Sequence, residues 1–203
     1  MKLGIISDIH GNHDALAQGL DVLSNVDQIV CLGDAINQHR FSNEVVGLLR
    51  ERNIQTIWGN HEQVFFSPVG ERARQAPWID QSLLSWLESR PLSVLQRYGD
   101  KKILLVHSTP HEPTGGYVEG LGGAFDKQFG NSTADVIFCG HTHVPSVRRA
   151  GSTLVVNPGS LGEGRPVAGG YINSCAVFHL DTDTVEIVDL VATAPACSLK
   201  NDV

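Results

Sequence analysis

The sequence has no long run of apolar residues. No stretch approaches the roughly 18 consecutive apolar residues that a helix needs to cross a bilayer. The apolar run near the amino terminus ends at the polar pair Ser7 and Asp8, and it is far too short for a signal peptide. We therefore expect a soluble, cytoplasmic protein without a membrane partner.

The sequence also lacks any block of like charges. Charged residues make up 18% of the 203 residues, the formal net charge is −7, and the lysines and arginines are scattered. A protein that grips a nucleic-acid strand tightly needs a basic stripe or a groove of stacking aromatic rings, and the sequence indicates neither. We therefore expect no tight nucleic-acid binding. A small phosphorylated substrate remains compatible with the acidic balance, because bound cations can attract an anion into a cleft.

Cysteine is scarce, and its positions argue against disulfides. Cys31, Cys139 and Cys175 lie in apolar runs typical of buried strands, which favours reduced thiols packed in a core. The fourth cysteine falls in residues 192–203, which we expect to be a frayed tail. Repeats and low-complexity segments are absent too, and the length favours a single domain over residues 1–191.

The first sixty residues alternate between apolar strands and amphipathic helices. The pattern predicts strands at 2–7, 28–32 and 54–58, a helix at 14–25, and a second helix that begins after Ser42 as its N-cap. This β-α-β-α-β order indicates a parallel sheet with right-handed crossovers.

Strand patterns dominate the rest of the chain after one more helix, which Asp80 should cap and Pro91 should end. The strands are predicted at residues 102–106, 135–139, 153–156, 174–179 and 185–188. The glycine-rich segment from Pro110 to Gly130 is expected to form a loop and a short helix at the mouth of a site.

Polar side chains gather where these strands end. The residues that follow a predicted strand in this way are Asp8, His10, Asp34, Asn60, His61, His107, His141 and His143. In an α/β sheet, ligands gather at the carboxyl ends of the strands, so residues scattered along the sequence should meet in space. We expect them to form one site.

The residue types of this set suit a catalytic metal centre. Carboxylate and amide oxygens mixed with imidazole nitrogens fit Mn²⁺, Fe or Zn²⁺, whereas an all-oxygen set would indicate Mg²⁺ or Ca²⁺. Taken singly, Asp8, Asp34 and Asn60 could equally be turn residues or helix caps. Alone, His107 would be read as a core histidine. Their joint occurrence after successive strands favours metal ligands.

Several motifs in this set together resemble those of the calcineurin-like metallophosphoesterase family. They are Asp8-Ile9-His10, Gly33-Asp34, Gly59-Asn60-His61-Glu62, His107 and Gly140-His141-Thr142-His143, in that order. The resemblance covers residues 1–190. Asn157-Pro158-Gly159-Ser160, followed by Arg165, is similar to the small bacterial and archaeal phosphodiesterase branch.

The resemblance implies a four-layer αββα sandwich with two mixed β-sheets and a binuclear metal site. One metal would be held by Asp8, His10, Asp34 and His143, and the other by Asp34, Asn60, His107 and His141. Asp34 would bridge the two ions, with Mn²⁺ the preferred metal because imidazole ligands suit transition metals. A water activated between the ions would attack phosphorus.

The same resemblance assigns roles to three further residues. His61 would act as the general acid that protonates the leaving oxygen, and Arg165 could bind the substrate phosphate. Protein-phosphatase relatives carry an Asp and an Arg after Gly-Asp, whereas here Asn37 falls in the corresponding stretch. We expect Asn37 to hydrogen-bond His61 without supplying a negative charge, which argues against protein phosphatase activity.

These observations predict a metallophosphoesterase, a hydrolase that acts on a small phosphate diester or monoester. Two other functions remain open: a non-catalytic protein-binding scaffold with the same fold, and a nuclease of the superfamily. The sequence leaves open whether the protein forms a homo-oligomer.

Overall fold

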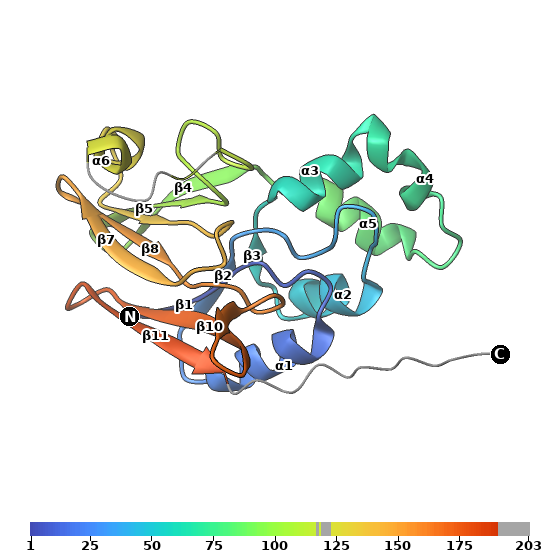
Figure 1. The fold of residues 1–203 in the computed structure, drawn as a ribbon, viewed down its shortest axis with the longest axis horizontal. Helices are drawn as coiled ribbons and strands as arrows, with labels where there is room; N and C mark the ends of the chain where they lie inside the picture. The colour runs from blue at the N-terminus through green and yellow to red at the C-terminus, as the bar shows by residue number, and fades with distance from the viewer. Residues whose placement is uncertain (117, 119–122, 191–203) are drawn as a thin grey trace.

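The computed structural model describes residues 1–116, 118 and 123–190, and their strands and helices build four layers (Figure 1). Part of the segment 110–130 and the tail predicted at 192–203 lie outside the described residues. The prediction of a single domain over residues 1–191 stays a prediction.

One sheet has six strands, five of them in the order β11-β10-β1-β2-β3, while β9 pairs with the far end of β10. Their bounds are β1 Lys2–Ile6, β2 Gln28–Cys31, β3 Gln55–Thr56, β9 Arg165–Val167, β10 Gly170–His179 and β11 Thr184–Leu190. The strands β1, β2 and β3 are parallel, as the β-α-β-α-β pattern predicts. The strand β10 runs antiparallel beside β1, which makes the sheet mixed.

The second sheet has five strands in the order β4-β5-β6-β8-β7. Their bounds are β4 Ser93–Tyr98, β5 Lys101–Val106, β6 Val136–Phe138, β7 Ser146–Ala150 and β8 Thr153–Asn157. The three central strands are parallel, and the two edge strands are antiparallel to their neighbours. The carboxyl ends of β5 and β6 therefore lie at the same end of the five-stranded sheet. Those of β1, β2 and β3 likewise lie at one end of the six-stranded sheet.

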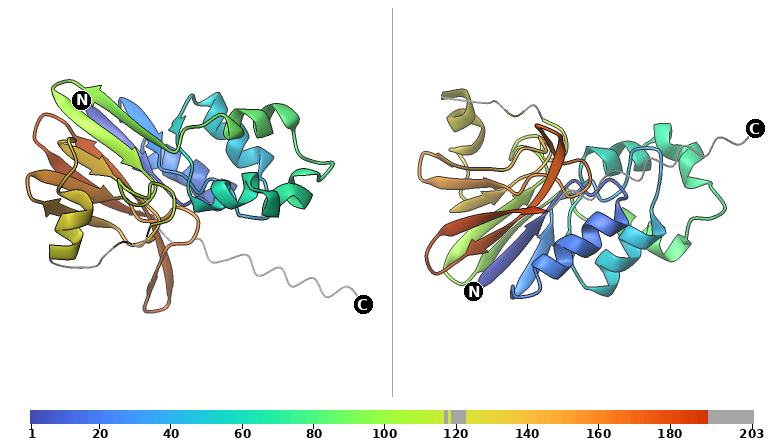
Figure 2. Two further views of the ribbon diagram at one scale, coloured as in Figure 1. Left: turned by 90° about the horizontal axis from the view of Figure 1, so that it is seen from above. Right: turned by 60° about the horizontal axis from the view of Figure 1, so that its bottom comes forward.

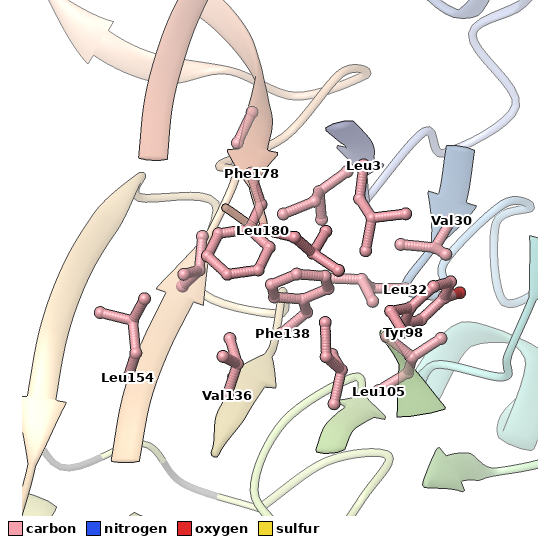
Figure 3. Close-up of a cluster of buried hydrophobic side chains, with 14 of the residues drawn as sticks. Leu3, Val30, Leu32, Tyr98, Leu105, Val136, Phe138, Leu154, Phe178 and Leu180 are labelled. Carbon is pink, nitrogen blue, oxygen red and sulfur yellow. The ribbon is translucent and has the colours of Figure 1, made fainter. Parts of the chain in front are cut away.

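The two sheets pack face to face through a buried apolar core (Figure 3). Successive side chains of a strand point to opposite faces, so Val136 and Phe138 of β6 enter this core while Ile137 points to the outer side. The rings of Phe138 and Phe178 join the two sheets edge to face, with centroids 5.6 Å apart. This core fixes the relative position of the two sheets.

Helices cover both outer faces. The helices α1 (His13–Val22) and α2 (Asn43–Glu51) pack on the six-stranded sheet through side chains such as Leu16 and Leu49. The helix α6 (Gly123–Phe129) packs Phe125 and Phe129 on the outer face of the five-stranded sheet. The layers are thus α, β, β and α, which confirms the predicted fold class.

A group of shorter helices lies beside the sheets (Figure 2). It comprises α3 (Asn60–Phe66), a 3₁₀ turn at Pro68–Gly70, α4 (Glu71–Arg74) and α5 (Gln81–Glu88). Their apolar side chains, among them Phe65 and Leu87, pack with Phe41 in a separate cluster.

The local structure confirms most of the sequence-based expectations. The Ser42 hydroxyl accepts from the Val45 N–H, and Asp80 caps α5. Cys31, Cys139 and Cys175 are free and buried. The sequence did not indicate β4, β7, β9 or α3. The short helix predicted within the segment 110–130 is α6, which forms the fourth layer. None of the described helices is long and apolar enough to cross a membrane.

Candidate metal centre

The loops that follow β1, β2, β5 and β6 are joined by backbone hydrogen bonds. Beyond β1 and β2, the Asp8 N–H donates to the Gly33 carbonyl at 3.1 Å. Beyond β5 and β6, the Gly140 N–H donates to the His107 carbonyl at 2.8 Å. The side chains predicted as metal ligands are therefore carried by loops that continue the pairing of the parallel strands.

The side chains of Asp8, His10 and His143 point at one another, with the buried Asp8 at their centre. The Asp8 Oδ1 atom is buried and has no hydrogen-bond partner, although His143 Nε2 lies at 3.3 Å and His10 Nε2 at 3.9 Å. The two Nε2 atoms are 3.1 Å apart. A buried carboxylate oxygen without a partner is costly, and a cation between these three atoms would satisfy it.

A second convergence forms around Asn60. Its Oδ1 atom lies 3.0 Å from His107 Nε2 and 2.9 Å from His141 Nδ1. The Asp34 Oδ2 atom lies 3.2 Å from the same His107 nitrogen. An amide oxygen, a carboxylate oxygen and two imidazole nitrogens thus face one another beside the first group, and they are the donor types that transition metals accept.

The protonation of His107 and Asp34 indicates strong local negative charge. Burial lowers the pKa of His107, but Asp34 and Asp8 outweigh it and raise that pKa to about 9. Burial raises the pKa of Asp34, but His107 outweighs it and lowers that pKa to about 2. The His107 Nδ1–H donates to the Leu32 carbonyl at 2.8 Å, which orients Nε2 toward the centre. A metal at this place would take over the role of the His107 proton.

Burial also lowers the pKa of His10, although the carboxylates of Asp34 and Asp8 oppose it. The pKa of His141 is lowered by burial and by the charge of His107. Both imidazoles are therefore neutral near pH 7, and a neutral imidazole has the lone pair that a metal requires.

Five of the candidate ligands have left-handed backbone conformations. The φ angles are 54° for Asp8, 50° for His10, 50° for Asp34, 68° for His141 and 58° for His143. Residues other than glycine adopt this region at a cost of about 1–3 kcal/mol, and such strain gathers at functional sites. Only two other described non-glycine residues have positive φ, so the strain is concentrated in the candidate centre.

Two glycines allow the backbone to approach the carboxylates. A Cβ on Gly59 would collide with the Asp34 side chain, and a Cβ on Gly140 would collide with Ser7 and Asp8. The motifs Gly-Asn-His-Glu and Gly-His-Thr-His therefore begin with glycine for a steric reason.

Glu62 was not assigned a role by the sequence, yet it holds two site loops together. Its buried carboxylate accepts from the N–H groups of Asp34 at 2.8 Å, Ile36 at 3.1 Å and Gly59 at 2.8 Å. Burial, together with the charge of Asp34, raises the pKa of Glu62 to about 7. Glu62 lies three residues after the N-cap Gly59 and accepts from its N–H, which is the glutamate half of a capping box; glycine has no side chain to supply the other half.

His61 borders the candidate centre without joining the second convergence. Its backbone N–H donates to Asp34 Oδ1 at 2.8 Å, and its ring packs edge to face on His10 with centroids 4.6 Å apart. Its Nδ1 accepts from the Gln38 N–H at 3.2 Å, which leaves Nε2 facing Asp34 Oδ2 at 4.0 Å. The expected bond from Asn37 is wrong, because the Asn37 amide donates to the His10 carbonyl at 2.8 Å.

The segment 157–160 holds the loops that carry Asp8 and His141 in place through hydrogen bonds. The Ser160 hydroxyl donates to the Asp8 carbonyl at 2.8 Å, and the Asn157 amide donates to the Gly140 carbonyl at 2.6 Å. Nearby, Glu163 Oε2 lies 3.8 Å from His143 Nδ1. No motif in the sequence pointed to Glu163, which reaches the centre from the segment between β8 and β9.

Arg165 is engaged in an ion pair. Its Nη2 lies 2.7 Å from Asp189 Oδ2 on β11, and the bond raises the pKa of the guanidinium. Its Nη1 is buried without a hydrogen-bond partner. To bind substrate phosphate, Arg165 would have to exchange Asp189 for it, and this role stays a prediction.

Sequence comparison shows to which family this site belongs. The model of the calcineurin-like phosphoesterase superfamily domain matches residues 1–183. The chain belongs to this superfamily. It is 30% identical over 215 residues to "Uncharacterized protein MJ0912" of Methanocaldococcus jannaschii. The match covers 92% of this chain and 86% of that protein.

Solved structures show the same fold. A metallophosphoesterase from Sphaerobacter thermophilus is similar at 27% identity, with a TM-score of 0.76 and coverage of 94% of this chain and 89% of that chain. An archaeal phosphodiesterase has a TM-score of 0.60 at 21% identity, with coverage of 94% and 100%. Hydrolysis of phosphate esters is therefore the general activity that the superfamily supports for this chain.

Proposed function

We propose that the protein hydrolyses a small phosphate diester or monoester with the help of two bound metal ions. The buried, unpartnered Oδ1 of Asp8, facing the Nε2 atoms of His10 and His143, is the observation that carries this proposal. A buried carboxylate oxygen without a hydrogen-bond partner needs an explanation, and a bound cation would satisfy it. The side chains that converge around Asn60 would hold the second metal ion.

We assign the ligands by combining the two convergences with the family resemblance, with Asp34, which lies within 4.8 Å of His10, as the shared ligand. The first ion would be held by Asp8, His10, Asp34 and His143, and the second by Asp34, Asn60, His107 and His141. When bound, such ions supply a water of lowered pKa and neutralise charge on the attacking and leaving oxygens. The mixture of oxygen and imidazole donors favours Mn²⁺, with Fe or Zn²⁺ as alternatives.

His61 is the residue of the chain best placed to move a proton. The Gln38 N–H occupies Nδ1, so Nε2 is the nitrogen that faces the candidate centre and can hold the transferable proton. We assign Nε2 of His61 as the donor to the departing oxygen of the ester.

A scaffold function is the second candidate, since Vps29 proteins from Entamoeba histolytica and Cryptosporidium parvum share the fold. Those similarities, at 19% and 18% identity, concern the fold alone. A scaffold does not need strained backbone in the ligand-bearing loops after β1, β2 and β6, so the strain at Asp8, Asp34 and His143 favours the enzyme.

Chelation tests the proposal directly. Protein stripped with a chelator should lose hydrolysis of bis(p-nitrophenyl) phosphate, and Mn²⁺ should restore it better than Mg²⁺, because imidazole donors suit transition metals. Metal analysis should find about two ions per chain after reloading with Mn²⁺. Full activity of protein shown to be metal-free would refute the proposal.

A further inference from the structure

A cavity of about 370 Å³ opens beside the candidate metal centre. It shares His10 with the centre, and Asn37, which donates to the His10 carbonyl, lies next to it. Its other lining residues are Gly11, His13, Arg40, Phe41, Ser42, Glu44 and Trp78. The volume lies within the range of about 300–1,000 Å³ that is usual for small-molecule sites.

A second cavity is larger, at about 580 Å³, but it lies elsewhere. Its lining includes Gln28 and Gln55, which begin β2 and β3. Ligands of such sheets bind at the carboxyl ends of the strands. The smaller cavity is therefore the one that a substrate of the metal centre would occupy.

The indole of Trp78 stands at this smaller cavity and is 51% exposed. Its backbone is held in place, because Asn43 Nδ2 donates to the Trp78 carbonyl at 2.8 Å and Asn43 Oδ1 accepts from the Asp80 N–H at 3.0 Å. The intervening Ile79 is buried among the side chains of the helical cluster. An anchored aromatic ring that faces solvent can stack on a planar ligand at little entropic cost.

The charges of the cavity are mixed. Arg40 is exposed and belongs to a tight turn, in which it exchanges two backbone hydrogen bonds of 3.1 Å with Asn37. The same cavity is lined by Glu44, whose backbone N–H and neighbouring Ser42 hydroxyl hold the pKa of its carboxyl below the usual range. A cation and a carboxylate together suit a neutral group rich in donors and acceptors better than a second phosphate, which Glu44 would repel.

We propose that this cavity binds the nucleoside part of the substrate, with the base stacked on Trp78 and the sugar facing Arg40 and Glu44. The substrate would then be a nucleotide ester whose phosphate lies at the candidate metal centre, on the far side of His10. This inference rests on the proposed function. One stacking ring suits a single base, in agreement with the expectation that the protein does not bind a nucleic-acid strand tightly.

The first experiment measures binding without catalysis. Saturation-transfer NMR with adenosine, which has no phosphate, should show transfer to the base protons in both metal-loaded and metal-free protein. Trp78→Ala should weaken adenosine binding about 5- to 150-fold, since stacking on an aromatic ring contributes about 1–3 kcal/mol per base. The control is Tyr171→Ala, which removes another exposed ring, outside this cavity, on the β9–β10 hairpin.

The second experiment compares two esters with the same leaving group. Metal-loaded protein should have a higher kcat/KM for thymidine 5′-(p-nitrophenyl) phosphate than for methyl p-nitrophenyl phosphate. Trp78→Ala should reduce this preference by about 5-fold or more, and Arg40→Gln should reduce it as well. The matched control Arg52→Gln changes an exposed arginine that lines the other cavity, and it should keep the preference.

The outcomes separate this inference from the proposed function. Adenosine binding that depends on Trp78, in a protein that hydrolyses no ester, would support the pocket and refute the enzyme. Hydrolysis without a nucleoside preference and without adenosine binding would support the enzyme and overturn the pocket. Equal losses on both esters in Trp78→Ala would also overturn it, because the cavity would then hold the nitrophenyl group.

Discussion

The imidazole of His61 is fixed at Nδ1 by the Gln38 N–H, so its reactive nitrogen is Nε2. We predict that His61→Asn keeps both metals and the fold but loses about 10²–10⁴ in rate on alkyl phosphate esters. The loss on nitrophenyl esters should be much smaller, because a nitrophenolate departs without a proton. Rates on both ester types, with metal content measured in parallel, check this prediction.

An equal loss on both ester types, at unchanged metal content, would assign His61 to phosphate binding instead. A control is His13→Asn. His13 is exposed at the start of α1 and lines the proposed nucleoside cavity, but it belongs to neither candidate ligand set. Its substitution should not change the dependence of the rate on the leaving group.

Asp34 and His143 differ in how many ligand groups they join. Asp34 lies close to a histidine of each proposed set, with a ring nitrogen of His10 within 4.8 Å and His107 Nε2 at 3.2 Å, whereas His143 groups only with Asp8 and His10 of the first set. Asp34→Ala should therefore lower the occupancy of both metal sites, and His143→Ala should chiefly lower one. Metal analysis of the two purified variants checks this, with Asp21→Ala on the exposed face of α1 as a control. One fully occupied site in Asp34→Ala would contradict the assignment of Asp34 as the bridge.

At the scale of elements, Glu62 joins the start of α3 to the loop after β2. In Glu62→Gln, the amide NH₂ group would face backbone N–H groups that now donate to a carboxylate. A buried donor left without an acceptor costs about 1–3 kcal/mol. We expect a Tm lower by about 2–4 °C for each kcal/mol in a chain of this size, measured by thermal unfolding.

The comparison for Glu62→Gln is Glu71→Gln. Glu71 is exposed in the first turn of α4, so its substitution should leave Tm nearly unchanged. Equal Tm values for the wild type and Glu62→Gln would show that the three hydrogen bonds are not needed to hold the loops.

The elements that the sequence predicted are those with a strong apolar pattern. Buried strands such as β1 and β8, and helices with a capping residue such as α5, could be placed within a few residues. The edge strand β7 contains two consecutive arginines, and β9 has only three residues, one of them a proline, so neither carries a full apolar pattern. Edge strands need not be apolar, since only one side of their backbone is paired.

The candidate ligands could be predicted because they follow strands, but their supporting residues could not. Glu62 and Glu163 act through buried or long-range hydrogen bonds and contacts that depend on the complete fold. His61 bonds to the Gln38 N–H and not, as expected, to Asn37. This depends on the tight turn at Asn37–Arg40, whose geometry the residue types alone do not determine.

At the scale of the whole molecule, the candidate centre joins the two sheets, because its ligands come from loops of both. In metal-free protein, the raised pKa of His107 contributes stability that is fully present below pH 6.5 and is lost as the pH rises through about 9. A bound metal would replace this proton, so the stability should then no longer depend on it. We predict that Tm falls between pH 6.5 and 9 in chelator-treated protein.

The same scan with Mn²⁺ provides the control, and its Tm should be higher and change less over this range. A Tm that falls equally with and without metal would show that His107 is not a ligand. A Tm that is constant in metal-free protein would show that His107 is not protonated there.

The position of β1 has a consequence for how the chain is made. Lys2 of β1 pairs with His179 of β10, so a strand made early in this domain is completed by one of its last. At about 5–20 residues per second, the nascent chain waits roughly 10–35 s for this partner. All seven candidate ligands have been synthesised by residue 143, well before β10 begins at Gly170. During that interval one edge of β1 has no partner, which makes the unfinished chain a natural client for chaperones.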